Sequence, residues 1–521
     1  MLAFKVVLSV SLLFAYLASA PGAGLSLDEE SYFAWAQRIL AGDWLGRGPF
    51  FQDPLYPYVL AGLIRLGGES LMLARFVNVA LGVLSLVLLE RVVRGLFSPG
   101  MAVWAAALWS LVGTVVLDEV TLSKEPLMVA LMLAAASLAL GASGPRISGA
   151  FASGLLAGAL VLVRGNFLAL LPLASWFYLR HLPRRSGIVA VAGLGLFPAL
   201  FALRNGVQEG RPLPSTAATG MVFFMGHSDF ADGTWAQAPF VRGNPLHEIP
   251  DYVTEASRRL GREVTAYEAS RYFLGQGLAF IQEHPGQELA LLFKKVRLTF
   301  SWEEVPGNYS RSCLRDRFLP GLWLAPLSGA LLWPLALAAV MALWRRPVVQ
   351  FLALGAGLYA LTLWATFVVE RYRLPLWVAA VVLAPAGALH LRQAWDSAYR
   401  ARVVFGAALC VALLAWPVRE GAGKRELAHC LALAGATLLQ EGYRDEALPL
   451  LHEAAALYPD SSQSHFNLGV LFASKEDWPQ AANAFARYLE RASPAQVKTT
   501  CDSMKPVELK RLLEAWCGSG P

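Results

Sequence analysis

Long apolar segments recur along the chain and are separated by short polar stretches. A run of roughly 17 to 25 apolar residues is long enough to cross a bilayer as a helix. By this measure we predict eleven membrane spans, near residues 3–20, 71–90, 100–117, 126–142, 147–163, 167–180, 187–203, 321–344, 348–369, 374–391 and 401–417. The expected fold class is therefore all-α, with a polytopic transmembrane helical core.

Positive charges between these segments predict the orientation of the core, because Arg and Lys collect beside short cytoplasmic loops. The basic clusters all fall on one side of the predicted spans: Arg91 and Arg94; Arg146; Arg180, Arg184 and Arg185; Arg345 and Arg346; Arg392, Arg400 and Arg402. The external side then carries residues 21–70, 118–125, 164–166, 204–320, 370–373 and everything after 418. Residues 1–20 also have the form of a signal peptide, with an apolar core and an Ala-Ser-Ala end.

Composition agrees with a membrane location, since 56% of the residues are hydrophobic, 16% are charged and the mean hydropathy is +0.47. The net charge of +6 does not indicate a nucleic-acid partner, because the basic residues form short clusters between apolar runs and no basic stripe. The five cysteines lack metal-ligand spacing. Cys501 and Cys517, near the C-terminus, either pair in an oxidising compartment or remain free thiols.

The chain divides into a membrane core, 1–417, with an external loop region at 204–320, and a C-terminal domain, 418–521. The C-terminal domain repeats a pattern at about 34 residues, which resembles the tetratricopeptide repeat. We predict repeats at about 428–461 and 462–495 and a capping helix at 505–516, together a small helical solenoid. Such a domain is either a docking surface for a protein partner or a structural appendage.

The external loop region is less regular. Helices are predicted near 248–260 and 264–300, followed by a turn at VPGNYS. Its histidines, His227, His247 and His284, are isolated, and we interpret them as surface or hydrogen-bonded residues rather than as metal ligands.

The segment LDEESYFAWAQRILAGDW, residues 27–44, follows directly on the first apolar segment. Its apolar residues recur at three- and four-residue spacing, which predicts a helix. Ser26 and Glu29 have the spacing of a capping box, so Glu29 has a structural explanation. An acid in the first turn of a helix is stabilised as the anion. Asp28 is therefore suited to act as a general base, and Glu30 is either solvated or lines a cavity.

Acidic residues also end the third predicted span and begin the fourth. Asp118 and Glu119 are followed by Lys124 and Glu125, and Pro126 favours the first turn of a helix. A polar hairpin loop explains this pattern, yet ionisable residues at the end of a span are costly unless they are solvated or paired. Because this loop and the first acidic stretch share the predicted external side, their acids are candidates for one site.

The sequence ERYRLPL, which begins at Glu370, forms a short external turn between two predicted spans. Arg371 and Arg373 flank Tyr372, and Arg164 is a further external cation near a span end. Such a turn can anchor at lipid headgroups. Guanidinium groups also bind phosphate oxygens with bidentate geometry, so the turn is either an interfacial anchor or a phosphate site.

Together these motifs resemble a known family. DEESYFAWAQRILAGDW and FFQDPLYPYVLAGLIRL are similar to the first external loop of the GT-C integral-membrane glycosyltransferases, and ERYRLPL resembles a turn late in many bacterial relatives. The group includes the protein O-mannosyltransferases and the lipid A aminoarabinose transferase, which are similar to glycosyltransferase family 39. The resemblance covers roughly residues 1–400.

The resemblance implies an inverting reaction with a sugar on polyprenyl phosphate as donor. Asp28 matches the first-loop acid near the reaction centre, and Glu29 the second acidic place. A second-loop acid is matched by Glu125 or, less closely, by Asp118 or Glu119. The donor phosphate is expected at Arg371, Arg373, Tyr372 and Lys124, and the cavity at Glu30, Asp53, Tyr56, Asp118, Glu119 and Arg164. Asp53 is a departure, because the aminoarabinose transferase has a lysine there.

The expected function is a glycosyltransferase, of hexosyl or pentosyl type, that moves a sugar to an extracytoplasmic lipid, glycan or protein acceptor. The expected location is the bacterial inner membrane, with the active face and the tail in the periplasm. An O-antigen ligase or polymerase, a lipid-linked-sugar transporter or flippase, and a noncatalytic assembly scaffold are the alternatives. The sequence has no nucleotide-binding loop, and its clustered acids could hold a divalent cation but lack diagnostic spacing.

Overall fold

The computed structural model describes residues 1–25, 27–46, 48–50, 52–68, 70–140, 147–241, 245–395, 411–412, 418–419, 422–492 and 497. Within these ranges the regular structure is helical, and the only β-type pairing is an isolated bridge between Val112 and Leu327. The expected all-α fold class is confirmed.

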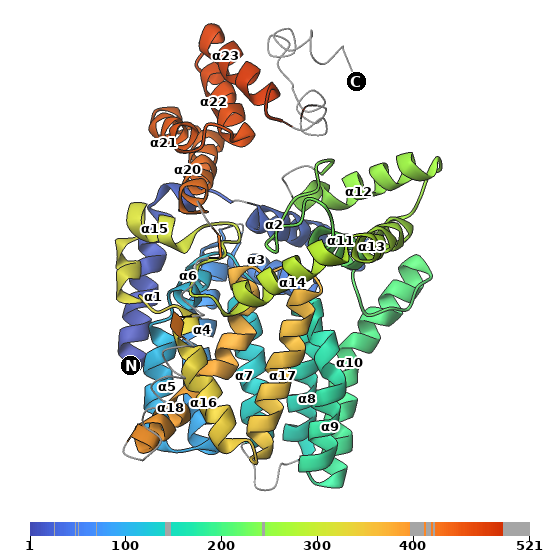
Figure 1. The fold of residues 1–521 in the computed structure, drawn as a ribbon, viewed down its shortest axis with the longest axis vertical. Coiled ribbons are helices and arrows are strands. Elements are labelled where there is room, and N and C mark those ends of the chain that lie inside the picture. The colour runs from blue at the N-terminus through green and yellow to red at the C-terminus, as the bar shows by residue number, and fades with distance from the viewer. Residues whose placement is uncertain are drawn as a thin grey trace.

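A bundle of upright helices forms the core (Figure 1). It contains α4 (Met72–Leu96), α5 (Pro99–Ser110), α7 (Glu125–Leu140), α8 (Ile147–Val163), α9 (Leu171–His181), α10 (Arg184–Glu209), α16 (Trp333–Leu343), α17 (Pro347–Trp364) and α18 (Leu374–Trp395). In the described part of the chain, four helices are long and apolar enough to cross a membrane, or five if the bent pair α6–α7 is one span. The protein is therefore a multi-pass membrane protein, and the number of spans stays a prediction. The predicted span 401–417 lies almost entirely outside the described residues.

Further helices cover one end of this bundle, the upper end in Figure 1. They are α2 (Asp28–Leu40), α3 (Leu55–Gly67), α6 (Gly113–Val120), α11 (Thr219–Gly226), α12 (Pro245–Leu260), α13 (Ala266–Glu283), α14 (Pro285–Phe300) and α15 (Arg311–Arg317). Five 3-10 turns complete the core: η1 (Ala20–Gly22), η2 (Gly165–Leu170), η3 (Pro320–Leu324), η4 (Gly329–Leu332) and η5 (Glu370–Arg373). The basic turns that join α9 to α10 and α16 to α17 lie at the opposite end.

The predicted helix 264–300 is wrong in one respect, because it is two helices that separate at His284. Pro285 is the first residue of α14, where its missing N–H costs no hydrogen bond. The capping box of this region belongs to α13, in which Thr265 and Glu268 satisfy each other's backbone N–H groups.

Helices α8 and α10 pack at very short distance, because glycines face the neighbouring backbone. A Cβ at Gly154 would lie 1.8 Å from the Ala190 carbonyl oxygen, and one at Gly158 would lie 2.3 Å from that of Leu194. Small residues four apart permit this close approach between membrane helices. The pair thereby forms a rigid flank of the bundle.

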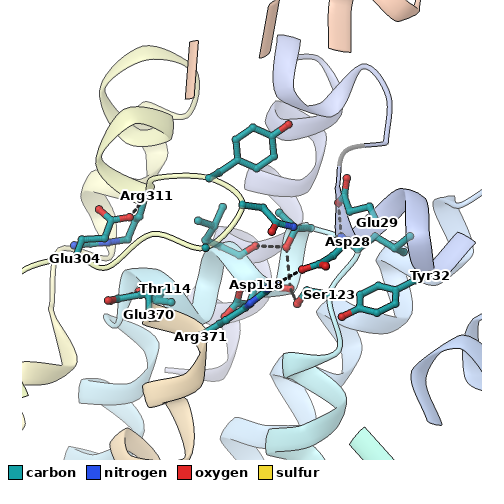
Figure 2. A pocket seen from close by; sticks show the side chains of 16 residues that line it. Asp28, Glu29, Tyr32, Thr114, Asp118, Ser123, Glu304, Arg311, Glu370 and Arg371 are labelled. Atoms are coloured by element: carbon teal, nitrogen blue, oxygen red, sulfur yellow. Dashed lines mark hydrogen bonds and ion pairs between the residues drawn. The ribbon is translucent and has the colours of Figure 1, made fainter. Parts of the chain in front are cut away.

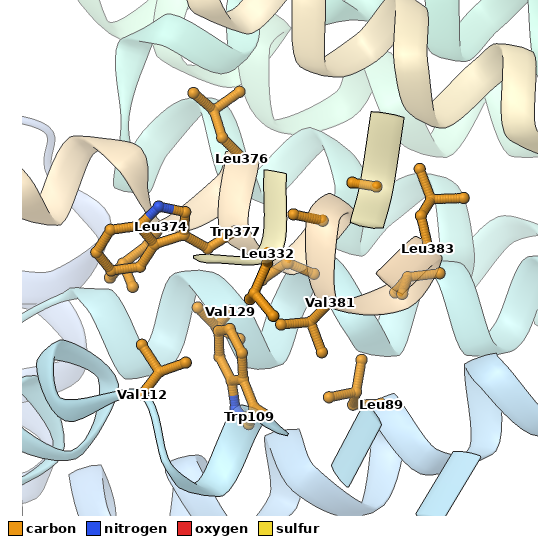
Figure 3. Close-up of a cluster of buried hydrophobic side chains, with 14 of the residues drawn as sticks. Leu89, Trp109, Val112, Val129, Leu332, Leu374, Leu376, Trp377, Val381 and Leu383 are labelled. Carbon is orange, nitrogen blue, oxygen red and sulfur yellow. The ribbon is translucent and has the colours of Figure 1, made fainter. Parts of the chain in front are cut away.

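The largest apolar cluster lies among α4, α5, α7, α16 and α18 (Figure 3). Trp109 and Trp377 are fully buried within it, and the Trp377 ring occupies the space that a side chain at position 329 would need. Because α18 is packed from several sides, η5, which directly precedes it, has a fixed base.

Helix α1 (Leu2–Leu17) packs against α4 and α6. The Lys5 ammonium lies 2.7 Å from the Glu119 carboxylate, Ser9 donates to the same carboxylate oxygen at 2.8 Å, and all three side chains are buried. Removing α1 would leave Glu119 buried without its counterion, which is costly.

The described part of the C-terminal domain contains two helical hairpins, α20 (Ala422–Gln440) with α21 (Arg444–Leu457) and α22 (Ser462–Ser474) with α23 (Trp478–Leu489). Both hairpins contain the same close contact at the predicted repeat spacing: Gly435 faces Leu451, and Gly469 faces Phe485. The assignment to the tetratricopeptide family stays a prediction. The predicted capping helix 505–516 and the cysteines at 501 and 517 lie outside the described residues.

A disulfide that the sequence did not indicate links this domain to the core. It joins Cys313 in α15 to Cys430 in α20. Nearby, Arg317 pairs with Glu453, and the Glu303 carboxylate accepts hydrogen bonds from the backbone N–H groups of Val418 and Arg419. The C-terminal domain is thus fastened to the loop between α14 and α15.

Candidate active site

A polar cavity opens at the covered end of the bundle. It is lined by Asp28, Glu29, Tyr32, Thr114, Leu117, Asp118, Thr121, Leu122, Ser123, Glu304, Gly307, Asn308, Tyr309, Arg311, Glu370 and Arg371. The space between these side chains, its open mouth included, is about 650 Å³. Figure 2 shows Asp28 and Tyr32 on one side, Glu304 and Arg311 on the other, and Arg371 and Asp118 between them.

Asp28 is the first residue of α2, and its carboxylate points into the cavity. One carboxylate oxygen lies 2.5 Å from Nη1 of Arg371, and the other accepts a hydrogen bond of 3.0 Å from the Gln52 amide. Gln52 is oriented in turn by Ser31, which donates to the amide oxygen at 3.0 Å. The side chain of Asp28 is therefore held in one direction by two elements distant in sequence.

The electrostatics of Asp28 favour its charged form. Burial alone would raise the pKa of this carboxyl group, but the Arg371 guanidinium, together with Lys124 and a hydrogen bond from Asn308, lowers the pKa below its usual value. At neutral pH Asp28 is thus an anion that is paired with a cation.

Arg371 is only partly buried, with 23% of its side chain exposed, and it lines the cavity. Its Nε is buried and has no hydrogen-bond partner within the described residues. The guanidinium therefore retains a donor that an incoming anion can use.

Arg373, two residues further along η5, has a different environment. Its side chain is fully buried, and it donates hydrogen bonds of 2.9 Å to the carbonyl oxygens of Leu298, Ser301 and Glu303. It also pairs with the Glu370 carboxylate. Because these partners hold both Nη atoms and Arg373 does not line the cavity, the expectation that it contacts the donor phosphate is not supported.

Among the three candidates for the second-loop acid, Asp118 lines the cavity. Glu119 is paired with Lys5, and Glu125 is buried in an ion pair with Arg164. The reason is the sharp bend of 114° between α6 and α7, which turns residues on its two sides in different directions. The geometry therefore favours Asp118 over the predicted Glu125.

The other acids of the first stretch have separate surroundings. The Glu29 carboxylate accepts a hydrogen bond of 2.8 Å from the Leu122 N–H and lies 3.7 Å from Arg75. Ser26 lies outside the described residues, and α2 is preceded by Leu27, which makes no side-chain cap. Glu30 is half-buried and is not among the residues that line the cavity.

A second polar layer adjoins the cavity. Arg164 pairs with Glu125 and lies over the Tyr372 ring at 4.1 Å. Lys124 pairs with Asp53 at 2.9 Å, and the other Asp53 oxygen accepts from the Gly165 N–H at 3.0 Å. Asp53, the departure from the family pattern, thus binds the very lysine that was expected at the phosphate.

Tyr56 connects this layer to α2. Its ring packs edge-to-face on Tyr32, which lines the cavity, and its hydroxyl accepts a hydrogen bond from Asn78.

The sequence did not single out Glu304, Asn308 and Arg311, which form one wall of the cavity. They lie in the loop that includes VPGNYS and at the start of α15. Burial, followed by the nearby Glu370, raises the pKa of Glu304 to about 7. Nothing in their local pattern distinguishes these residues from an ordinary turn.

In the described ranges, no three His, Cys, Asp or Glu side chains are grouped closely enough to hold a metal ion. Four acids of the two external loops are instead each paired with one cation: Asp28, Glu29, Glu119 and Glu125. The residues present therefore do not form a divalent-cation site, and we derive no step through one.

Comparison with known proteins supports the class that this site indicates. Residues 49–203 match the sequence profile of the family described as dolichyl-phosphate-mannose-protein mannosyltransferase. No curated protein matches the chain. The matched segment contains Asp118 and Arg164 but neither Asp28 nor Arg371, so the roles of the last two depend on the geometry.

Two solved structures are also similar. ArnT from Cupriavidus metallidurans bound to undecaprenyl phosphate is 15% identical, with 97% of this chain and 81% of that chain covered and a TM-score of 0.36. The oligosaccharyltransferase AglB from Archaeoglobus fulgidus, in complex with an inhibitory peptide and a dolichol-phosphate, is 14% identical, with 83% and 56% covered and a TM-score of 0.35. The family profile matches less than half of the chain and supports a resemblance over that segment, and these two structural likenesses carry no argument. The resemblance to the GT-C integral-membrane glycosyltransferases is confirmed.

Proposed function

We propose that the protein transfers a sugar from a polyprenyl-phosphate-linked donor to an extracytoplasmic acceptor, with inversion at the anomeric carbon. The contact between Asp28 and Arg371 inside a cavity at one end of a membrane bundle carries this proposal. A carboxylate and a guanidinium in this arrangement supply an acceptor for a hydroxyl proton and a counterion for a departing phosphate.

The transfer is a single displacement. The acceptor hydroxyl oxygen forms a bond to the sugar C1 while the bond between C1 and the phosphate oxygen breaks. The electron pair of the broken bond leaves with the lipid phosphate, beside Arg371. The hydroxyl proton passes to the Asp28 carboxylate and from there to solvent. Asp118, the second acid of the cavity, helps to orient the acceptor.

The two residues also control each other. While Arg371 is paired with Asp28, the pKa of Asp28 is lowered, which makes the carboxylate a weak base. A donor phosphate that binds the guanidinium shares its charge and hydrogen bonds, so Asp28 becomes more basic when the donor arrives. The base is thus strengthened only in the presence of the leaving group that the reaction requires.

An apolar cavity in the bundle supports a lipid donor. It has an empty volume of about 1270 Å³ and is lined by residues of α7, α8, α9, α17 and α18, nearly all of them apolar. Phe167 and Tyr359 line it, and Tyr359 lies in the same layer as Arg164. A cavity of this chemistry suits an isoprenoid chain whose phosphate lies at the polar end of the bundle.

The Cys313–Cys430 disulfide supports an extracytoplasmic position for the cavity and the C-terminal domain, since disulfides persist in oxidising compartments. We therefore place this face in the periplasm of a bacterial inner membrane. The hairpins of the C-terminal domain would offer their remaining surface to a protein partner.

The direct test is Asp28→Asn in the full-length chain, assayed for sugar transfer from polyprenyl-phosphate sugars in membranes. Loss of a general base lowers turnover by about 10²- to 10⁴-fold. Asp43→Asn is the matched control, because Asp43 follows the other end of α2 and does not line the cavity.

Full activity of Asp28→Asn would overturn the proposed base. Transport of a lipid-linked sugar that continues without any transfer, in both the wild type and the variant, would support the flippase alternative instead.

A further inference from the structure

The guanidinium of Arg311 is left without a partner on the wall of the cavity. Its Nε and Nη1 atoms are buried and have no hydrogen-bond acceptor among the described residues. A buried donor without an acceptor costs about 1–3 kcal/mol, and more when it is charged. Native structures contain few such groups, so this one requires an explanation.

The backbone around Arg311 is firmly held. Its N–H and that of Ser312 both donate to the Glu304 carboxylate, the second at 3.0 Å. Ser310 caps the same turn by accepting from the Cys313 N–H, and Cys313 is fixed by its disulfide. The side chain therefore starts from a fixed backbone position.

The space that the guanidinium occupies is also specific. A Cβ on Gly113 would lie 2.8 Å from Nη1 of Arg311, so the absence of a side chain at this position makes room for the cation. Gly113 begins α6, whose later residues Leu117 and Asp118 line the cavity. Arg311 is thus fitted between two elements of the cavity wall.

The neighbouring carboxylates are already engaged. Glu304 accepts the two backbone N–H groups, and Glu370 accepts from Thr114, from the Val305 N–H and from Arg373. Neither forms an ion pair with Arg311 in the part of the chain that the structure describes. Within the described residues, the cavity therefore has one arginine paired with a catalytic carboxylate, Arg371, and one arginine that forms no ion pair, Arg311.

We propose that Arg311 binds an anionic oxygen of the donor phosphate, as a second cation beside Arg371. This inference depends on the proposed function, and it adds a residue to the donor site that precedes Glu370, the first residue of ERYR, by 59 positions. An anion bound at this wall satisfies the buried donors of Arg311.

The test measures binding of farnesyl phosphate, a short isoprenyl phosphate, to the purified full-length chain in detergent by isothermal titration calorimetry. Arg311→Gln is expected to weaken binding by about 10- to 100-fold, the equivalent of one charge-assisted hydrogen-bonded contact. Farnesol, which lacks the phosphate, is expected to bind both proteins equally. Arg311→Lys keeps the charge and should retain part of the affinity.

Arg315→Gln is the matched control, since Arg315 is on the same helix but pairs with Asp316 and does not line the cavity. Formation of the Cys313–Cys430 disulfide in each variant, seen on a non-reducing gel, reports that α15 is folded.

The outcomes separate this inference from the proposed function. Unchanged farnesyl phosphate affinity in Arg311→Gln, with lost affinity in Arg371→Gln, overturns the role of Arg311 and leaves the proposed function intact. A transfer assay in which Arg311→Gln raises only the KM of the acceptor also overturns this role, because Arg311 would then bind an anionic group of the acceptor. No binding of farnesyl phosphate to the wild type contradicts both.

Discussion

The 3-10 turn η5 places one arginine in the open cavity and another in the buried interior next to it. Arg371 enters the cavity, where it contacts Asp28 and keeps an unused donor. Arg373 enters the interior, where three carbonyl oxygens and Glu370 surround it. The motif presents the two arginines as equivalent, but Arg371 has a functional position and Arg373 a structural one.

The difference teaches how to distinguish functional from structural charges. Both arginines are close to a carboxylate, so proximity to an opposite charge does not separate them. Access to the cavity does, because a site for a ligand must present its donors to the incoming molecule. Arg371 lines the cavity with 23% of its side chain exposed, whereas the Arg373 side chain is fully buried.

The largest expected effect is on folding. Arg373→Ala should lower the free energy of unfolding by about 3–5 kcal/mol, because Glu370 and the three carbonyl oxygens remain buried without their partner. Thermal unfolding in detergent measures the change. Arg371→Ala should lose less stability, because the Asp28 carboxylate that it leaves unpaired faces the open cavity, where water can solvate it. Equal losses in the two variants would abolish the distinction between the two regions.

The next effect is on catalysis. Arg371→Gln should reduce the rate of transfer by roughly 10²- to 10³-fold, as expected for one preorganised donor at a developing charge. The amount of folded protein should be unchanged, which size-exclusion chromatography checks beside the activity assay. Activity near the wild-type level would remove Arg371 from the reaction.

A smaller effect is expected at the attachment of the C-terminal domain. Replacing both Cys313 and Cys430 by Ser should weaken this attachment by about 2–4 kcal/mol, since the bridge closes a separation of 117 residues. Limited proteolysis between core and domain measures the change. Arg317→Gln is the control, because its pair with Glu453 is exposed and contributes at most about 1 kcal/mol. Identical cleavage of all three proteins would contradict a role for the disulfide.

The smallest effect is a dependence on pH. Burial and Glu370 raise the pKa of Glu304 to about 7, so the carboxyl gains its charge as the pH passes from 6 to 8. The new charge faces Arg311 and competes with a bound phosphate. The KM of the donor should therefore rise by roughly fivefold, equivalent to about 1 kcal/mol of screened Coulomb energy.

Glu304→Gln should remove the rise of the donor KM between pH 6 and pH 8. If the donor KM still depends on pH in this variant, another group causes the dependence. The sign for stability follows from the same shift. An acid with a raised pKa in the folded state favours folding at low pH and loses that contribution as the pH rises from about 4.5 to about 7.

Much of the fold could be predicted because the apolar segments are long and the basic clusters mark one side. Both Asp28 and Arg371 were expected on the external side, and the motifs that contain them resemble the same family, which predicted that they would share a cavity. The structure brings them into contact. Neither residue would have been found from local pattern alone, since charged residues near span ends are common.

What the sequence could not predict depends on contacts between distant segments. Whether Asp118 or Glu125 faces the cavity is decided by the bend between α6 and α7, and Glu125 is taken by Arg164. Arg311 has an ordinary sequence context, and its significance comes from Gly113 and from the partners it lacks. The connectivity of cysteines cannot be deduced from their positions.

The bridge between Cys313 and Cys430 also has a consequence for biogenesis. Cys430 follows every helix of the membrane core, so the ribosome has delivered all of them before the bridge can close. In the proposed orientation, oxidation is then a late event that follows complete insertion, and the wall that bears Arg311 is fastened only in chains whose C-terminal domain has reached the oxidising side. A chain inserted with the wrong polarity would keep both thiols reduced and this wall unfastened.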